Sequence, residues 1–307
     1  MTRIGMAVFT ACGLIVGGAQ AQDGARAYHL LPEGTDIISL ATVHMQLGRV
    51  FEPVDTINST DSMATTLTPS YLRTFDVFGN VGAFVVGIPF GGASTLVDTI
   101  GGDFEYDTGV THGDLFVGGL LGLVGSPSLE PMDYVQHKPG FRAGVVTKLF
   151  LPTGDYDPDR QLNLGANRWS LHASLPISYV LGESMLDPSL TTFEIVPSVH
   201  IYGDNTDPTS MADVTGQAPL FGIEGHITRN FGNAVWASLD GHYEFGGETS
   251  ADGIGNNDAV QNLSFGATLG LSLSPTVQLR LAYEEMVYSN VPNSTARTIN
   301  ITSAVLF

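Results

Sequence analysis

The feature that most constrains this sequence is a period-two alternation of apolar and polar residues, which returns in one segment after another. In the clearest segment, residues 168–181, Leu171 and Tyr179 fall on one face and His172 on the other. This period is typical of a β-strand whose two faces meet different surroundings. After Ala21 no apolar run reaches the 18 residues that a transmembrane helix needs. The chain is therefore predicted to be all-β.

About twelve segments carry this pattern or a weaker form of it, separated by Gly, Asn, Asp and Pro. An even number of strands is typical of a closed antiparallel barrel with both termini on one side. We expect tight turns at 79–80, 230–233 and 274–275, alternating with long acidic loops at 91–111, 203–218 and 246–260. The predicted strands are 35–51, 66–78, 81–90, 112–124, 141–151, 168–181, 192–202, 220–231, 234–245, 261–273, 276–288 and 297–307.

The alternation fits two kinds of β protein, a water-soluble sandwich or lipocalin-like barrel and an outer-membrane barrel with its apolar face toward lipid. The polar faces favour lipid, because Ser, Thr, Gly and His predominate and the only lysines are Lys138 and Lys148. Exposed soluble sheets usually carry many more charges. The chain also ends in an apolar strand that closes on Phe307, as barrels recognised by the outer-membrane assembly machinery do. We therefore predict a closed antiparallel transmembrane β-barrel of about twelve strands.

The charge balance excludes other classes. The chain has 31 Asp and Glu against 12 Lys and Arg, a formal net charge of −19, and charged residues make up 14% of it. A nucleic-acid partner is not expected, because no cationic stripe is present to neutralise phosphates. An acidic disordered chain is not expected either, since 43% of the residues are hydrophobic.

The first residues are typical of a secretory signal peptide. Arg3 precedes an apolar run, and Ala19 and Ala21 form an Ala-x-Ala cleavage site. Cleavage after Ala21 would remove Cys12, the only cysteine, so the mature chain would have neither a disulfide nor a thiol nucleophile. We expect a signal peptide at 1–21, a short periplasmic segment at 22–34 and the barrel at 35–307.

Some features do not fit uniform strands. Pro89, Pro176 and Pro197 fall inside predicted strands, where each removes a hydrogen-bond donor, so we expect bulges or local breaks. Arg73 lies in the register of apolar residues. The connection at 125–140 is also longer than a typical periplasmic turn.

Several short stretches resemble a family of outer-membrane proteins labelled as meta-pathway phenol-degradation proteins and often called transporters. They are RAY at 26–28, LPEGT at 31–35, LPTGDY at 151–156 and LNLGANRW at 162–169. The resemblance extends over almost the whole mature chain. It implies a β-barrel in the outer membrane of a Gram-negative bacterium that passes aromatic or other apolar compounds, and it carries no catalytic residues.

If the apolar faces meet lipid, the opposite faces line a lumen. Two interpretations of that lining remain open. It forms a polar core in which charges pair with one another, or it forms a selective pathway. The candidate lumen-lining residues are His44, Arg142, Lys148, His172, Glu194, His200, Glu224, His226, Asp240, His242, Glu244, Arg280 and Glu284.

Hairpin pairing predicts which of these side chains meet. A turn near Gly232 would set Glu224 opposite Asp240, with His226 and His242 on the same face. Carboxylates and imidazoles together can bind a divalent metal, but this spacing matches no metal motif, and we assign neither metal nor cofactor. By the same arithmetic His172 and His200 are equidistant from Leu186. The alternating Asp155, Asp157 and Asp159 lack the glycine-centred loop of a calcium site and indicate a solvated acidic loop instead.

The sequence predicts a passive channel or transporter for small molecules, with aromatic or apolar cargo. The alternative is a structural or ligand-binding barrel with a plugged lumen and acidic surface loops. A hydrolase is not predicted: Ser198 and His200 share a face, but no Gly-x-Ser-x-Gly motif occurs. The expected partners are outer-membrane lipid and lipopolysaccharide, the barrel assembly machinery through Phe307, and the cargo itself.

Overall fold

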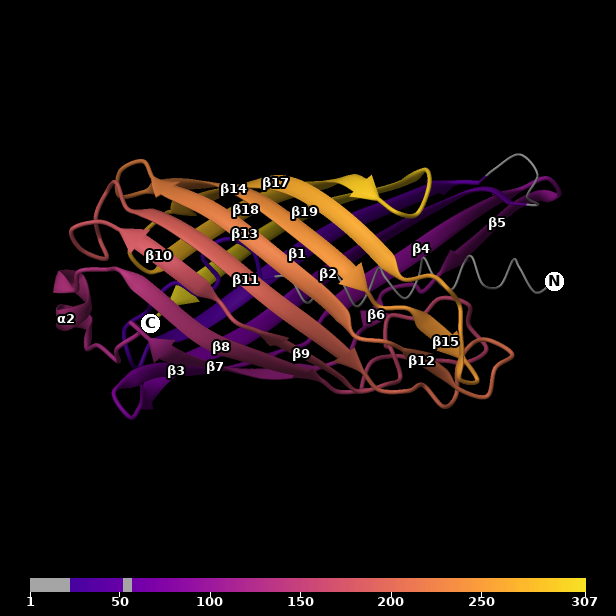
Figure 1. The fold of residues 1–307 in the computed structure, drawn as a ribbon, viewed down its shortest axis with the longest axis horizontal. Helices are drawn as coiled ribbons and strands as arrows, with labels where there is room; N and C mark the ends of the chain where they lie inside the picture. Colours follow the sequence, from indigo (N-terminus) through magenta and orange to yellow (C-terminus); the bar gives the residue numbers. More distant parts are fainter. Residues whose placement is uncertain (1–22, 52–56) are drawn as a thin grey trace.

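A closed antiparallel β-barrel makes up most of the molecule (Figure 1). The structure is a computed structural model that describes residues 23–51 and 57–307. The expected signal peptide at 1–21 lies outside the described residues. No helix in the described part of the chain is long and apolar enough to cross a membrane.

Twelve wall strands form the barrel, and three of them consist of two segments: β3 with β4, β6 with β7, and β9 with β10. The wall closes because the last strand, β19, pairs antiparallel with the first, β1. The predicted twelve-stranded barrel is confirmed. The wall segments are β1 (Asp36–Val50), β2 (Ile57–Val77), β3 (Asn80–Gly87), β4 (Phe90–Thr99), β6 (Thr111–His112), β7 (Phe116–Val124), β8 (Phe141–Phe150), β9 (Ser170–Ser174), β10 (Ile177–Leu181), β11 (Thr191–Tyr202), β13 (Leu220–Asn230), β14 (Val235–Gly246), β17 (Val260–Ser272), β18 (Val277–Ser289) and β19 (Ser294–Leu306).

The outer face of the wall is apolar. Leu239 is 70% exposed, Phe265 55% and Leu175 49%, whereas inward neighbours such as Thr268 and Ser174 are buried. Successive side chains of a strand point to opposite faces, so the sequence alternation becomes an inside and an outside. A band of large exposed apolar side chains around a closed barrel, in which every wall strand has two paired neighbours, is suited to the hydrocarbon of a membrane.

Two breaks interrupt the wall at prolines. Pro89 lies between β3 and β4, and Pro176 lies between β9 and β10, as the sequence suggested. Each break faces a proline in the adjacent strand: Ile88 N donates to Pro69 O at 3.3 Å, and Leu175 N donates to Pro197 O at 3.0 Å. Pro197 itself remains inside β11. Proline has no N–H, so Pro69 and Pro197 cannot donate the second hydrogen bond that residue pairs in an antiparallel sheet usually form. Each wall break therefore lies beside a position where the neighbouring strand also lacks a donor.

The two ends of the barrel differ (Figure 1). One end carries the C-terminus, tight turns such as Phe78-Gly79, and α2 (Pro131–Gln136), which occupies the long 125–140 connection. The other end carries the long connections. The expected loop at 91–111 is instead a hairpin of β4 with β5 (Gly102–Asp107), and the other long loops contain a small sheet of β12 (Thr215–Gln217), β15 (Thr249–Ala251) and β16 (Ile254–Gly255).

Arg73 marks the C-terminal end of the barrel on its outer face. Its guanidinium pairs with Asp36 at 3.2 Å and is half exposed, and the two residues are register partners of β2 and β1. A charge at this position lies at the border of the apolar band rather than within it. The unexpected register of Arg73 is therefore explained by its position along the strand.

Candidate functional site: the barrel interior

The described N-terminal segment, residues 23–34, enters the lumen before β1 begins. The Lys148 ammonium donates to the Asp23 carboxylate, Tyr28 Oη donates to Asp23 Oδ2 at 2.6 Å, and Arg280 Nη1 donates to Ala25 O at 3.2 Å. Ala25 is 1% exposed. The sequence placed 22–34 in the periplasm as a separate segment, whereas its described residues up to Leu31 pack against the inside of the wall.

Arg26 holds this segment against β13 and β14. Its Nε donates to Thr228 Oγ1 at 3.1 Å, and its guanidinium lies 4.6 Å from the centre of the Trp236 ring. Such a cation–π contact contributes about 0.5–2 kcal/mol depending on solvation. Together with the bonds to Asp23 and Ala25, it ties the segment to wall strands on several sides.

Most of the predicted lumen residues have their side chains on the inner face. His44 is the exception and corrects the sequence-based assignment: it pairs in register with Thr65 and Ile299 on the outer face, and its Nδ1 lies 2.8 Å from Thr65 Oγ1. The reason is that β1 turns apolar residues such as Met45 toward a cavity, so its polar face is not its inner face. The inward residues are Arg142, Lys148, His172, Glu194, His200, Glu224, His226, Asp240, His242, Glu244, Arg280 and Glu284.

A histidine–carboxylate network lies between β13 and β14. The register sets Glu224 opposite His242 and His226 opposite Asp240, which shifts the predicted pairing by two residues. His226 Nδ1 is 2.8 Å from Asp240 Oδ1, and its Nε2 is 3.4 Å from Glu224 Oε2. The shift arises because the turn is centred one residue later than Gly232 alone suggests. The predicted meeting of these side chains still occurs.

Hydroxyl donors complete this network. Ser238 Oγ and Thr268 Oγ1 each donate to a different oxygen of Asp240 at 2.6 Å. Among the described residues, no three His, Cys, Asp or Glu side chains are arranged to hold a metal ion. The geometry is that of charges compensated by hydrogen bonds, which is what groups removed from water require.

The predicted pairing of His172 with His200 is confirmed by the register, and their ring centres are 5.8 Å apart. A row of rings that sequence analysis missed extends from this pair: Phe150 lies 5.6 Å from His200, and Tyr202 stacks on it at 4.4 Å. The rings come from three strands, with His200 and Tyr202 both on β11, so the register between strands was needed to bring Phe150 and His172 to this pair. His200 Nε2 contacts Ser170 Oγ at 3.0 Å, and its Nδ1 has no hydrogen-bond partner, so it forms no couple with Ser198.

The connection at 151–169, which carries the stretches LPTGDY and LNLGANRW, packs against the inside of the wall, because Leu162 is buried with Ala64 and Ala93. Asp114 accepts hydrogen bonds from Gly154 N at 2.8 Å and Ala166 N at 3.0 Å, and Leu164 is 1% exposed. Asp155 accepts from both terminal nitrogens of Arg160 and from Thr111. These hydrogen bonds lower the pKa of Asp155 below its usual value. The acidic loop is therefore organised by an internal cation, Arg160.

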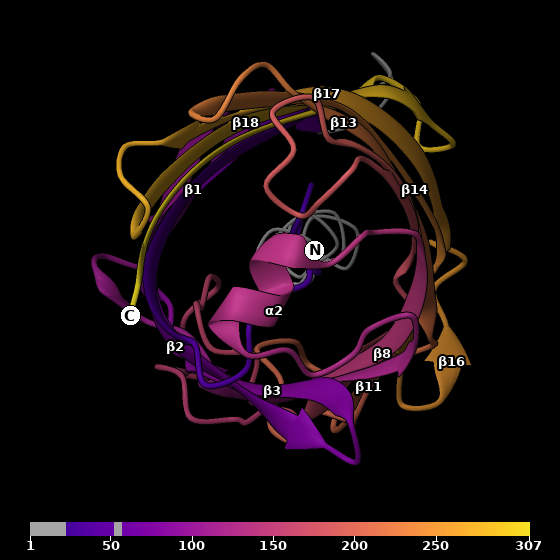
Figure 2. The ribbon, with the colours of Figure 1, turned by 90° about the vertical axis from the view of Figure 1, so that its left-hand side faces the viewer.

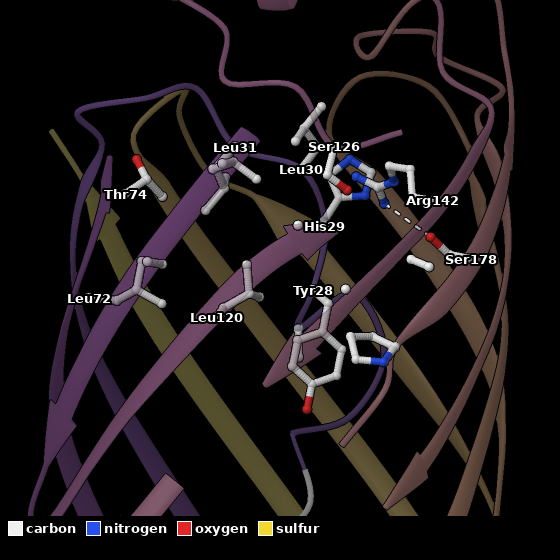
Figure 3. A pocket seen from close by; sticks show the side chains of 17 residues that line it. Tyr28, His29, Leu30, Leu31, Leu72, Thr74, Leu120, Ser126, Arg142 and Ser178 are labelled. Atoms are coloured by element: carbon white, nitrogen blue, oxygen red, sulfur yellow. Dashed lines mark hydrogen bonds between the residues drawn. The ribbon is translucent and has the colours of Figure 1, made fainter. Parts of the chain in front are cut away.

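Cavities remain on both sides of the N-terminal segment. The larger, which we call the outer cavity, has a volume of about 400 Å³ and lies toward the long loops; it is lined by residues of β1, β14, β17, β18 and β19. A smaller cavity of about 60 Å³ lies near the other end (Figure 3). There Tyr28, His29 and Leu30 face the wall residues Leu120 and Arg142 (Figure 3).

The end of the barrel with the C-terminus is covered. Figure 2 shows α2 lying across this mouth. Leu129 and Tyr134 around the helix pack against a buried cluster of Leu30, Val81 and Met185. The N-terminal segment and α2 thus share one apolar contact at the mouth.

A closed barrel with an apolar exterior and a polar interior defines the class: the protein is an outer-membrane β-barrel. The fold is similar to that of an outer-membrane channel from Pseudomonas putida F1, at 21% identity over 93% of this chain and 100% of that one, with a TM-score of 0.74. It is also similar to the translocator domain of the autotransporter NalP from Neisseria meningitidis, at 8% identity over 97% of each chain, with a TM-score of 0.51. The chain belongs to the family described as "Putative MetA-pathway of phenol degradation", which it matches over residues 53–296, so the family resemblance is confirmed. A comparison with curated proteins gives no match.

Proposed function

We propose that the protein is a channel through which small molecules pass the outer membrane passively. The observation that carries the proposal is the outer cavity: a space of about 400 Å³ inside a closed, lipid-facing barrel, toward the end with the long loops. A membrane-spanning wall with a solute-sized interior is the architecture of a pore. Flux through it would run down a concentration gradient.

The cargo we propose is a small molecule with an apolar or aromatic body. The description of the family supports this, and so does the lining of the outer cavity, where Met45, Leu47, Leu220, Val260 and Met286 present apolar surface. A pocket with an apolar wall and a few polar groups suits such ligands.

A second candidate function is a ligand-binding barrel whose lumen stays closed. The specific observation in its favour is the N-terminal segment, held to the wall by Lys148 and Arg280, together with α2 across the mouth. In this case the outer cavity would be a surface receptor site without transport. We propose a channel or binding barrel rather than an enzyme, because the fold is similar to that of an outer-membrane channel; the pair of Ser198 with His200 is not formed, since His200 contacts Ser170.

Conductance in planar bilayers and uptake of phenol by proteoliposomes separate the two functions. Wild-type protein that conducts and admits phenol supports the channel. Protein that is silent in both assays, and stays silent when residues 23–31 are deleted, is a closed binding barrel. Protein that conducts only after that deletion is a channel gated by the segment.

For assembly we propose that the barrel machinery recognises the C-terminal strand. Phe307 is 65% exposed, while its backbone is fixed by reciprocal hydrogen bonds with Asp36 at 2.9 Å. Deleting Phe307 is expected to reduce the amount of folded barrel in the membrane. The acidic loops at the other end are proposed to contact lipopolysaccharide through bridging divalent cations, and removal of Mg²⁺ tests this.

A further inference from the structure

Two kinds of side chain line the outer cavity. The apolar ones include Met45 and Leu47 of β1, Leu220 at the start of β13, and Met286 of β18. Among them lie the carboxylates of Glu244 and Glu284, from β14 and β18. A volume of about 400 Å³ falls in the range of small-molecule sites and holds a molecule of one aromatic ring with a short chain.

The carboxylates of this cavity differ from those deeper in the lumen. The side chains of Glu224 and Asp240 are almost fully buried, at 8% and 10% exposed, and both contact His226. Glu244 and Glu284 are more open, at 22% and 26%, and each lies 3.8 Å from the same imidazole, that of His242. Two carboxylates therefore share one imidazole, and both reach the free space of the cavity.

The other charged groups around the cavity do not compensate these two. Both carboxylate oxygens of Asp258 accept hydrogen bonds from Thr249, from its N at 2.7 Å and its Oγ1 at 2.6 Å. Arg49 stacks on Phe51, with its guanidinium 4.5 Å from the ring centre. The lining therefore contains three carboxylates, those of Glu244, Asp258 and Glu284, but only two basic groups, Arg49 and the shared His242. A cationic ligand would complete this charge balance, because opposite charges attract more strongly where water is partly excluded.

We propose that the outer cavity binds small organic ammonium ions, with the ammonium between Glu244 and Glu284 and the apolar body against Met45, Leu47 and Met286. The ammonium offers three N–H donors to the carboxylate oxygens. A carboxylate ligand of the same shape is repelled, and a neutral alcohol makes only a weaker hydrogen bond. The inference names the ligand class of the proposed channel and in that sense rests on it, although binding itself does not require transport.

Isothermal titration of the detergent-solubilised, full-length mature protein tests the proposal with three probes of matched size: 2-phenylethylammonium, 2-phenylethanol and 3-phenylpropionate. The ammonium is expected to bind at least about ten times more tightly than the alcohol, and the carboxylate least tightly. Equal affinity for the ammonium and the alcohol, or preference for the carboxylate, would overturn the proposal.

Variants from two strands locate the site. Glu284→Gln and Glu244→Gln should each lower the affinity for the ammonium about tenfold and leave that for the alcohol within a factor of two. The matched control is Glu285→Gln, since Glu285 is the next residue of β18, faces outward and pairs with Arg297 at 3.0 Å. Each variant is first shown to fold by its heat-shifted mobility on SDS gels. A loss of ammonium binding in Glu285→Gln equal to that in Glu284→Gln would also overturn the proposal.

Conductance is measured separately on the same samples. A barrel that binds the ammonium selectively but conducts nothing contradicts the channel and leaves the binding site standing. A barrel that conducts but does not distinguish the three probes contradicts the binding site and leaves the channel standing.

Discussion

Lys148 is one of two lysines in the chain, and its ammonium lies inside the barrel against the carboxylate of Asp23. Its side chain is 9% exposed and that of Asp23 22%. Removing one partner of a fully buried pair costs about 3–5 kcal/mol, because the other charge is left without compensation. Here part of that cost is avoided if the N-terminal segment leaves the wall. We therefore expect the pair to act as a latch that holds the segment in the lumen.

Lys148→Met is expected to release the N-terminal segment and raise the mean conductance in planar bilayers severalfold. Lys138→Met is the matched control, since that lysine is 72% exposed and lies outside the wall strands. The double variant Asp23→Asn with Lys148→Met should return toward the wild-type conductance, because no charge is then left unpaired. Equal conductance of wild type and Lys148→Met would contradict the latch.

Asp155 gives the folded loop at 151–169 a dependence on pH. Its pKa is lowered by hydrogen bonds from Arg160 and Thr111, so the stabilisation is complete above the ordinary aspartate pKa, about 4, and is lost as pH falls through the lower folded value. Limited digestion with pepsin across a pH series measures the opening of the loop. Arg160→Met should move the opening to higher pH, and Thr111→Val should move it less in the same direction. An unchanged midpoint in Arg160→Met would show that the loop does not depend on this pair.

At the scale of the element, the sequence predicted the strands well because the two faces of each strand meet lipid and lumen. It failed where a face has mixed chemistry. In β1, Val43, Met45 and Leu47 point inward, so polarity alone put His44 on the wrong side. The hairpin of β13 and β14 shows a second limit: a turn moved by one residue shifts every opposed pair by two, and the composition of a turn does not fix its centre that closely.

The two faces of β17 provide a test of what surrounds the barrel. Leu269 is exposed on the outer face, three residues before the end of β17, whereas Ser264 lines the outer cavity. Leu269→Arg is expected to cost about 1–3 kcal/mol, and Ser264→Arg clearly less, because the cavity has room for the side chain and carries the carboxylates of Glu244 and Glu284. Thr268 is not a useful control, since it is buried and donates to Asp240. Urea unfolding in lipid vesicles, followed by Trp fluorescence, measures both; equal costs would mean that lipid does not cover Leu269.

At the scale of the whole molecule, the interior is made by contacts between residues far apart in the chain. Asp23 and Lys148 are separated by 125 positions, and Arg26 and Thr228 by 202. No local sequence pattern predicts such pairs. The sequence could therefore identify inward-facing charges but could not show that the N-terminal segment contacts them. The same holds for the outer cavity, whose carboxylates come from β14 and β18. The fold could be predicted from the periodicity of the sequence, whereas the site forms only when the barrel closes and brings distant strands together.

Closure itself is set by the seam between the first and last strands. Ala41 of β1 and Thr302 of β19 are direct register partners there, and their side chains point inward. Directly opposed residues have Cα atoms about 4.5–5.5 Å apart, within the range of a disulfide, and the expected cleavage after Ala21 removes Cys12, the only native cysteine. Cysteines at Ala41 and Thr302 should therefore cross-link nearly completely on mild oxidation and keep the denatured chain fast-migrating on SDS gels. Cysteines at Ala41 and Ala304, two residues out of register, should cross-link far less; equal yields would mean that the seam slides or that the wall is open between its ends.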